Sequence, residues 1–241
     1  EIIGGRKHPC RAQAQLAVGG FQPPGRTLDI LRAQGLLDVK HRQPARGQRP
    51  AVQPHAHGRL AVAADAYLRH AIERAEAIAL RQIETPSARM FWPYVGLCWR
   101  LRGDARAGWL DGEPLLTRTL DLDFSADELE TLASMLRGLH RLKAPYPEQS
   151  VRGGTQTDRQ LFFHPDPAIQ AARAKIVAAI RTFIDALPAH DPRHPLLAPD
   201  REKILFEGSW SVRLAGAGHH ASHTHVMGWI SSALYVTVPD G

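Results

Sequence analysis

The sequence predicts an α+β protein in which helices come first and a β-rich region follows. Apolar residues recur at helical spacing from Leu60 to Leu187, and after Arg201 they alternate with polar residues as in strands. The distribution of charge divides the chain at a different point, after residue 58. Residues 1–58 hold nine Lys or Arg against three Asp or Glu, whereas residues 59–241 hold 21 of each sign. The net charge of +6 therefore belongs to the first segment, and the rest has no basic surplus that would indicate nucleic-acid binding.

The first 58 residues form a low-complexity basic segment. They are rich in Pro, Gly, Gln and Arg, as in HRQPARGQRPAVQPHAHG, and only Leu28 to Leu37 has helical periodicity. Such a composition buries too little apolar surface to offset the entropy of folding, so we expect residues 1–58 to be disordered. The arginines are not interleaved with aromatic residues, which argues against a single-stranded nucleic-acid-binding tail.

Composition also indicates the cellular compartment of the protein. Cys10 and Cys98 lie far apart and make neither a disulfide framework nor a metal-binding CxxC pair. No apolar run approaches the roughly 20 residues that a membrane span needs. We therefore expect a cytoplasmic protein with no membrane association.

Residues 59–145 are predicted to be a helical region. Ala, Leu and Ile recur at helical spacing over residues 60–83, and Ser87 can cap a second helix that stops at Gly103. A third helix begins at the sequence SADE, where Ser125 and the Glu three residues later form a capping box. Its apolar face ends near His140, so the region resembles a helical hairpin followed by one further helix.

Residues 146–241 combine one long helix with strands. Asp166 followed by Pro167 opens a helix over residues 166–187. The period then changes to two in KILFEGSWSVRL, residues 203–214, and again from Trp229 to Val238. Between these strands lies GHHASHTHVMGW, which places four histidines within seven residues: His219, His220, His223 and His225.

The histidine cluster is the candidate metal site. Imidazole is the commonest protein ligand for transition metals, and residues two apart on a strand point to the same face. If the strand has already begun at His223, then His223 and His225 can both aim inward and bind one metal ion. Lone histidines are more often surface or satisfied core residues, but four of them directly before a strand favour metal binding.

Two stretches resemble a known family. GSWSVRL and GHHASHTHVMGWISSALYVTVP are similar to the first core strands of an iron(II)/2-oxoglutarate-dependent oxygenase family related to the prolyl hydroxylases. Members are often fused to tetratricopeptide-type helices. WRLRGDARAGWLDG and QSVRGGTQTD also resemble the segment that precedes the barrel in that family. The resemblance covers residues 90–241 and implies the start of a double-stranded β-helix, or jelly-roll barrel, that holds Fe(II) and 2-oxoglutarate.

The resemblance assigns roles to particular residues. His223 matches the first metal histidine, while His225 stands where many relatives have Asp or Glu, so it either binds the metal or supports a ligand that does. Ser231 and Tyr235 match positions for polar contacts with the cosubstrate. Arg213 matches a strand position from which it can pair with a carboxylate, although a plain salt bridge is an equal alternative. The family's distal histidine and arginine come from later strands, so we expect the chain to be a truncated fragment.

The expected function is that of a non-haem Fe(II)/2-oxoglutarate-dependent dioxygenase, in particular a hydroxylase. Its partners would be 2-oxoglutarate, O2 and a protein or small-molecule substrate, without nucleic acid or membrane. Two alternatives remain. One is a helical-repeat interaction module without activity, and the other is a zinc-dependent hydrolase, which the lack of an HExxH motif disfavours. Metal content and dependence on 2-oxoglutarate distinguish the three.

Overall fold

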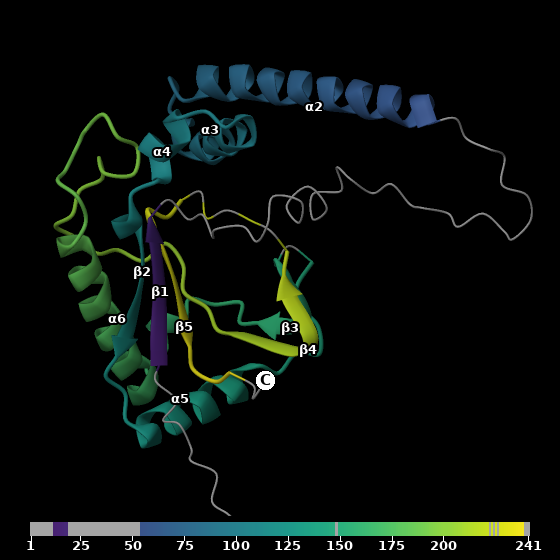
Figure 1. Cartoon of the computed structure of the whole chain (residues 1–241). Helices are drawn as coiled ribbons and strands as arrows, with labels where there is room; N and C mark the ends of the chain where they lie inside the picture. The colour runs from purple at the N-terminus through teal and green to yellow at the C-terminus, as the bar shows by residue number, and fades with distance from the viewer. Residues whose placement is uncertain are drawn as a thin grey trace, which may run out of the picture. The chain divides into compact units, whose positions relative to one another are not determined.

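The computed structural model describes residues 12–18, 54–147, 149–221, 223, 225 and 227–238, with side chains at 14, 16 and from 65 onward. It mixes helices with small antiparallel sheets, as the α+β class predicts (Figure 1). The elements fall into two compact units. One contains three helices, and the other contains all the strands and the remaining helices. None of the helices in the described ranges is long and apolar enough to cross a membrane.

The helical unit is a hairpin with a short third helix. It consists of α2 (Pro54–Gln82), α3 (Ala88–Arg102) and α4 (Arg106–Asp111). Gly103 ends α3 with a φ of 66°, in the left-handed region that favours glycine, so the predicted stop is confirmed. Inside the hairpin the buried Glu76 carboxylate accepts a 2.9 Å hydrogen bond from Trp99 Nε1 and pairs with Arg102 and Arg106. These contacts tie the end of α2 to α3 and α4.

The second unit is built around a three-stranded antiparallel sheet. Its strands are β1 (Ala12–Val18), β2 (Thr117–Leu122) and β5 (Ile230–Tyr235), in the order β2-β1-β5. The short 3-10 helix η1 (Pro114–Leu116) leads into β2. Because β1 is the central strand, it pairs on both sides, and its Ala14 lies opposite Leu120 and Leu234. The sheet therefore depends on a strand from the N-terminal segment.

The strands β1 and β2 each correct one prediction. Residues 1–58 are not wholly disordered, because residues 12–18 pair with two strands and bury Ala14 and Leu16. The reason is local: AQAQLAV alternates small or apolar residues with polar ones, and long-range partners supply the burial that the surrounding composition lacks. The predicted helical candidate at residues 28–37 lies outside the described residues. The helical region 59–145 also contains a strand, β2, between its helices.

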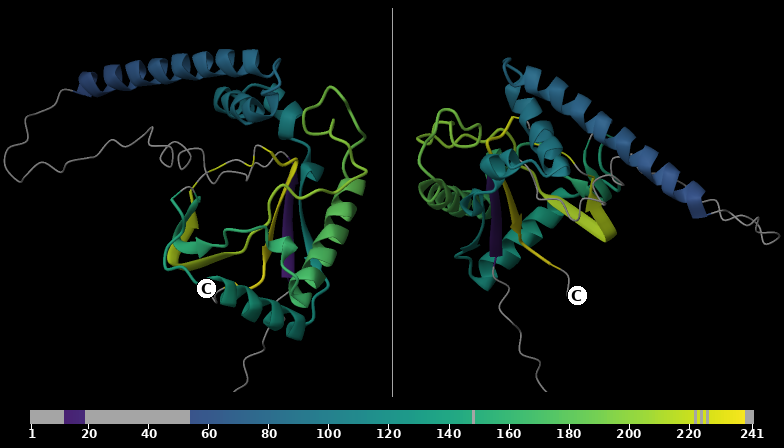
Figure 2. Two further views of the ribbon diagram at one scale, coloured as in Figure 1. Left: turned by 180° about the vertical axis from the view of Figure 1, so that it is seen from behind. Right: turned by 45° about the horizontal axis from the view of Figure 1, so that its top comes forward.

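Helices α5 (Ala126–Leu139) and α6 (Pro167–Asp185) flank the sheet, and α6 lies along it (Figures 1 and 2). The predicted capping box is confirmed, since Ser125 Oγ accepts from Glu128 N and the Glu128 carboxylate accepts from Ser125 N. The Asp166 side chain caps α6, where it accepts from Ala168 N. Apolar residues of α6 pack with β1 to form the main core: Ile176, Ile180, Phe183 and Ile184 with Ala14 and Leu16.

The remaining strands form a two-stranded antiparallel sheet, here called the ribbon. It pairs β3 (Val151–Gln156) with β4 (Val212–His220) and stands across from the three-stranded sheet (Figures 1 and 2). Gly154 has no room for a side chain, because a Cβ there would lie 2.4 Å from the Arg213 carbonyl oxygen. The 3-10 helix η2 (Leu161–Phe163) follows β3. Of the predicted strand over residues 203–214, only the part from Val212 onward forms.

Candidate functional site

The four histidines lie at and just beyond the end of the ribbon. His219 and His220 are the last residues of β4, where His220 pairs with the fully buried Val151 of β3. The Ser150 hydroxyl holds His220 through a 2.9 Å hydrogen bond to Nδ1. His223 and His225 follow outside the strand, so the ribbon anchors the cluster at one end.

His223 and His225 converge. Their Nε2 atoms lie 3.2 Å apart, and their rings are nearly perpendicular, with centroids 4.8 Å apart. His223 Nδ1 lies 2.8 Å from the Ala221 carbonyl oxygen. Because a carbonyl can only accept, this Nδ1 carries the proton, and Nε2 of the neutral ring keeps its lone pair. Metal-binding histidines are oriented in this way by a hydrogen bond from the other ring nitrogen.

The separation of the two Nε2 atoms fits one shared metal ion. Two nitrogens about 2.1 Å from a metal, at angles between octahedral and tetrahedral, lie about 3.0–3.4 Å apart. The observed 3.2 Å falls inside this range. Among the described residues no group of three or more His, Cys, Asp or Glu is placed to hold one metal ion.

The environment lowers the pKa of two of these imidazoles, His225 and His220. Burial lowers the pKa of His225, and the neighbouring His223 and His220 lower it further. The pKa of His220 is lowered in the same way, first by burial and then by His223 and His219. Only a neutral imidazole can bind a metal, so protons compete less well for His225 than for an exposed histidine.

The other predicted site residues lie elsewhere. Arg213 is on β4 opposite Thr155, and within the described residues it forms no ion pair. Ser231 and Tyr235 share one face of β5, opposite the face that packs Ile230 and Leu234 into the core. Within the described residues none of the three hydrogen-bonds with His223 or His225. The structure thus brings the Nε2 atoms of the two predicted metal histidines together, and among the described residues it shows no hydrogen bond between them and the three predicted cosubstrate residues.

A second polar cluster, centred on His140, lies on the ribbon. His140 Nδ1 is 2.8 Å from Thr155 Oγ1, and Nε2 is 3.0 Å from Ser211 Oγ. Burial lowers the pKa of His140, and the charge of Arg213 adds to the effect. For His140 the sequence predicts only a structural role at a helix end. Its partners are 15 and 71 residues away, so no local pattern indicates them.

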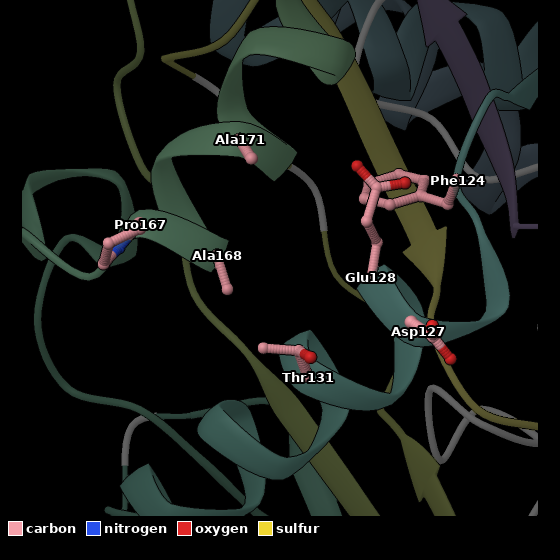
Figure 3. A pocket seen from close by; sticks show the side chains of 7 residues that line it. All are labelled: Phe124, Asp127, Glu128, Thr131, Pro167, Ala168 and Ala171. Carbon is pink, nitrogen blue, oxygen red and sulfur yellow. The ribbon is translucent and has the colours of Figure 1, made fainter.

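One pocket of the second unit has none of these histidines in its lining. It has a volume of about 300 Å³ and lies between the first turns of α5 and α6 (Figure 3). Its Glu128 carboxylate accepts from Ser125 N and pairs with Lys175, whose Nζ is 3.1 Å from Oε1. A smaller pocket of about 200 Å³ borders His140 and Thr155. Neither pocket is lined by His223 or His225, so the candidate site is defined by the two imidazoles rather than by a cavity.

Comparison of the chain with models of protein families, with curated proteins and with solved structures found no match. The functional argument therefore rests on the residues and their geometry.

Proposed function

We propose that the chain binds a divalent transition metal through His223 and His225, as part of a non-haem Fe(II)/2-oxoglutarate-dependent dioxygenase that acts as a hydroxylase. The observation that carries this proposal is the 3.2 Å separation of the two Nε2 atoms, together with the hydrogen bond from His223 Nδ1 to the Ala221 carbonyl. An imidazole pair of this kind, with positions left for other ligands, is typical of non-haem iron sites.

The arrangement of the sheets supports the fold part of the proposal. A jelly roll consists of two antiparallel sheets facing each other. Here a three-stranded antiparallel sheet and the two-stranded ribbon stand across from each other, and α6 covers one face of the former (Figure 1). We propose that these sheets belong to a double-stranded β-helix, with the histidine pair at the end of the ribbon.

Each residue has a distinct part in the proposed chemistry. His223 and His225 would hold the metal through their Nε2 atoms, and the lowered pKa of His225 means that protons compete less well for its ring. Arg213 has a guanidinium group without an anionic partner among the described residues, and it would pair with a carboxylate of the cosubstrate. Ser231 and Tyr235 would add hydroxyl contacts from the free face of β5. Iron with 2-oxoglutarate and O2 supplies the oxidation itself.

The compartment and the partners belong to the same proposal. The part of the chain that the structure describes has one free cysteine, the buried Cys98. Burial and the nearby Glu76 raise the pKa of its thiol, so it resists oxidation and metal binding. We therefore place the metal in the histidine pair and the protein in the cytoplasm, where Fe(II) and 2-oxoglutarate are available to it.

Metal titration tests the proposal directly. Fe(II) added anaerobically to the 241-residue chain should bind at one equivalent. His223→Ala should abolish binding, because it removes the ring whose orientation is fixed. His225→Ala should weaken binding at least about 10–100-fold, the range that supporting residues of metal sites reach. His219→Ala is the matched control, since His219 is exposed and should leave the affinity unchanged.

The same variants distinguish the competing classes. We expect the 241-residue chain by itself to be inactive, so in a full-length form that carries the distal ligands, release of succinate from 2-oxoglutarate, followed by NMR and lost in His223→Ala, would establish the oxygenase. Zinc binding without any dependence on 2-oxoglutarate would favour the hydrolase. If no metal binds to the wild-type chain, the interaction module is the better interpretation. Full iron binding by His223→Ala would show that the metal assignment is wrong.

A further inference from the structure

The two rings of the metal pair are held in different ways. His223 is fixed by the 2.8 Å hydrogen bond from its Nδ1 to the Ala221 carbonyl. Within the described residues His225 has no such partner, and its only hydrogen-bonding contact is the one between the two Nε2 atoms. A contact other than a hydrogen bond must therefore set the plane of the His225 ring in the metal-free chain.

The indole of Trp210 packs against the His225 ring. The ring centroids are 5.4 Å apart and the planes are inclined by 34°, so the two rings pack together in a tilted arrangement. Trp210 is 40% exposed, so the side chain lies at the surface. One residue, Ser211, separates Trp210 from the start of β4, so Trp210 lies at the opposite end of that strand from His219 and His220 and meets the loop that follows the strand.

The position of Trp210 is fixed by its close approach to Gly208 and by hydrogen bonds of the two residues beside it, Ser209 and Ser211. A Cβ at Gly208 would lie 2.5 Å from Cζ3 of the indole, so the indole occupies the space that any other residue at 208 would need. Ser209 Oγ accepts a 3.0 Å hydrogen bond from Phe162 N, and Ser211 N donates a 3.0 Å bond to Thr157 Oγ1. The backbone on each side of Trp210 is therefore tied to the chain that follows β3.

We propose that Trp210 is the positioning residue of the metal pair. Its indole, held over Gly208, sets the plane of the His225 imidazole so that Nε2 of His225 faces Nε2 of His223. This inference rests on the proposed function, because a positioning role requires that the pair binds a metal. Gly208 acts through Trp210 and touches neither histidine ring. In this proposal a hydrogen bond orients the His223 ring, and packing against the Trp210 indole orients the His225 ring.

Co(II) alone is a suitable probe, because its visible absorption reports ligand binding and it quenches nearby indoles. One equivalent added to the 241-residue chain should quench part of the tryptophan fluorescence, and Trp210→Phe should lose that part while it still binds Co(II). Trp210→Ala and Gly208→Ala should weaken Co(II) affinity roughly 10-fold, as loss of other orienting residues does. Gly138→Ala is the matched control, because a Cβ at Gly138 meets open space.

The outcomes separate this inference from the function on which it rests. If Co(II) binds and His223→Ala abolishes it, but Trp210→Ala and Gly208→Ala bind as tightly as wild type, the positioning role is wrong and the metal pair stands. If His223→Ala binds normally, the proposed function fails first. Should Trp210→Ala or Gly208→Ala not fold, the fluorescence of the wild type and of Trp210→Phe decides. Quenching that persists in Trp210→Phe would overturn the proposal.

Discussion

The two sheets of the second unit are stabilised by different kinds of interaction. The three-stranded sheet is held by burial, since Leu16 of β1 and Phe183 of α6 are both 0% exposed in a continuous apolar core. The ribbon is held largely by directional polar contacts. His140 joins Thr155 and Ser211, and the Ser150 hydroxyl holds His220.

This difference relates stability to function. Apolar burial is non-directional and depends on the area removed from water, so it builds a scaffold that does not depend on any single angle. Hydrogen bonds depend on distance and direction, and they fix the positions of particular atoms. The candidate metal pair lies at the end of the ribbon, where atomic positions matter most. Changes to the first sheet should therefore act globally, and changes to the ribbon should act locally.

The largest effect is expected from Leu16→Ala. Truncation of a fully buried Leu removes apolar contacts and leaves a cavity, which costs about 2–5 kcal/mol. Because β1 is the central strand, the whole unit should lose free energy of unfolding, as measured by urea denaturation. Leu205→Ala is the control, since Leu205 is 86% exposed and its truncation should change the free energy by less than about 0.5 kcal/mol. Equal effects of the two variants would show that β1 does not pack in the sheet.

A smaller and more local effect is expected from Gly154→Ala. The added Cβ would press on the Arg213 carbonyl and separate β3 from β4. Overpacking of this kind costs about 1–3 kcal/mol. Hydrogen exchange should become faster for amides of the ribbon, while amides of β1 keep their protection. Gly108→Ala, where a Cβ meets open space, should change neither region. Uniform loss of protection across both sheets would contradict the division into scaffold and ribbon.

Ser125→Ala tests a contact that belongs to neither sheet. The substitution removes the hydroxyl that accepts from Glu128 N and thereby breaks the capping box of α5. Loss of an N-cap costs typically about 1 kcal/mol. The midpoint of urea denaturation should fall by a corresponding amount, and Ser125→Asp should restore most of it because aspartate also caps. A midpoint unchanged in Ser125→Ala would mean that the cap is not needed.

Local sequence signals predicted the helices well. The starts at Ser125 and Asp166 and the stop at Gly103 follow from capping chemistry that involves neighbours two to four residues away. The predicted cap at Ser87 does not form, because the Ser87 side chain makes no capping hydrogen bond at the start of α3. The strand β1 could not be predicted in the same way. Its hydrogen-bonding partners lie about a hundred residues further on, in β2, and beyond two hundred, in β5. Composition favoured disorder because it averages over residues 1–58 and hides seven residues that pair at long range.

The candidate site was predictable only in part. His223 and His225 are close in sequence, so their spacing already indicated a common site, and the structure places their Nε2 atoms together. The orienting contacts of the pair were not predictable. Trp210 precedes β4 in the sequence and His225 follows it. No repeating sequence pattern marks residues that come together only in the tertiary structure. Whether Arg213, Ser231 and Tyr235 contact a cosubstrate stays a prediction.

The smallest effect is expected from removing the titratable group of the ribbon, His140. Burial, and then the charge of Arg213, lower the pKa of His140 in the folded chain, and its other neighbours Thr155 and Ser211 carry no charge. At pH values above the unfolded-state pKa of about 6.5, the ring is neutral whether the chain is folded or unfolded. As the pH falls below that value, His140 binds a proton in the unfolded chain but not yet in the folded chain. The free energy of unfolding therefore decreases until the lower, folded-state pKa is reached.

His140→Gln removes this proton from both states. Urea denaturation of the metal-free chain at pH 7.5 and at pH 5.5 should show a smaller loss of stability in His140→Gln than in the wild type. Other histidines with lowered pKa, such as His220 and His225, remain in both proteins, so the difference between the two isolates His140. His190→Gln, which removes an exposed imidazole, is the matched control for the substitution itself. Parallel pH profiles for wild type and His140→Gln would show that the ribbon does not depend on a neutral His140, and the contrast between the two sheets would then have to rest on packing alone.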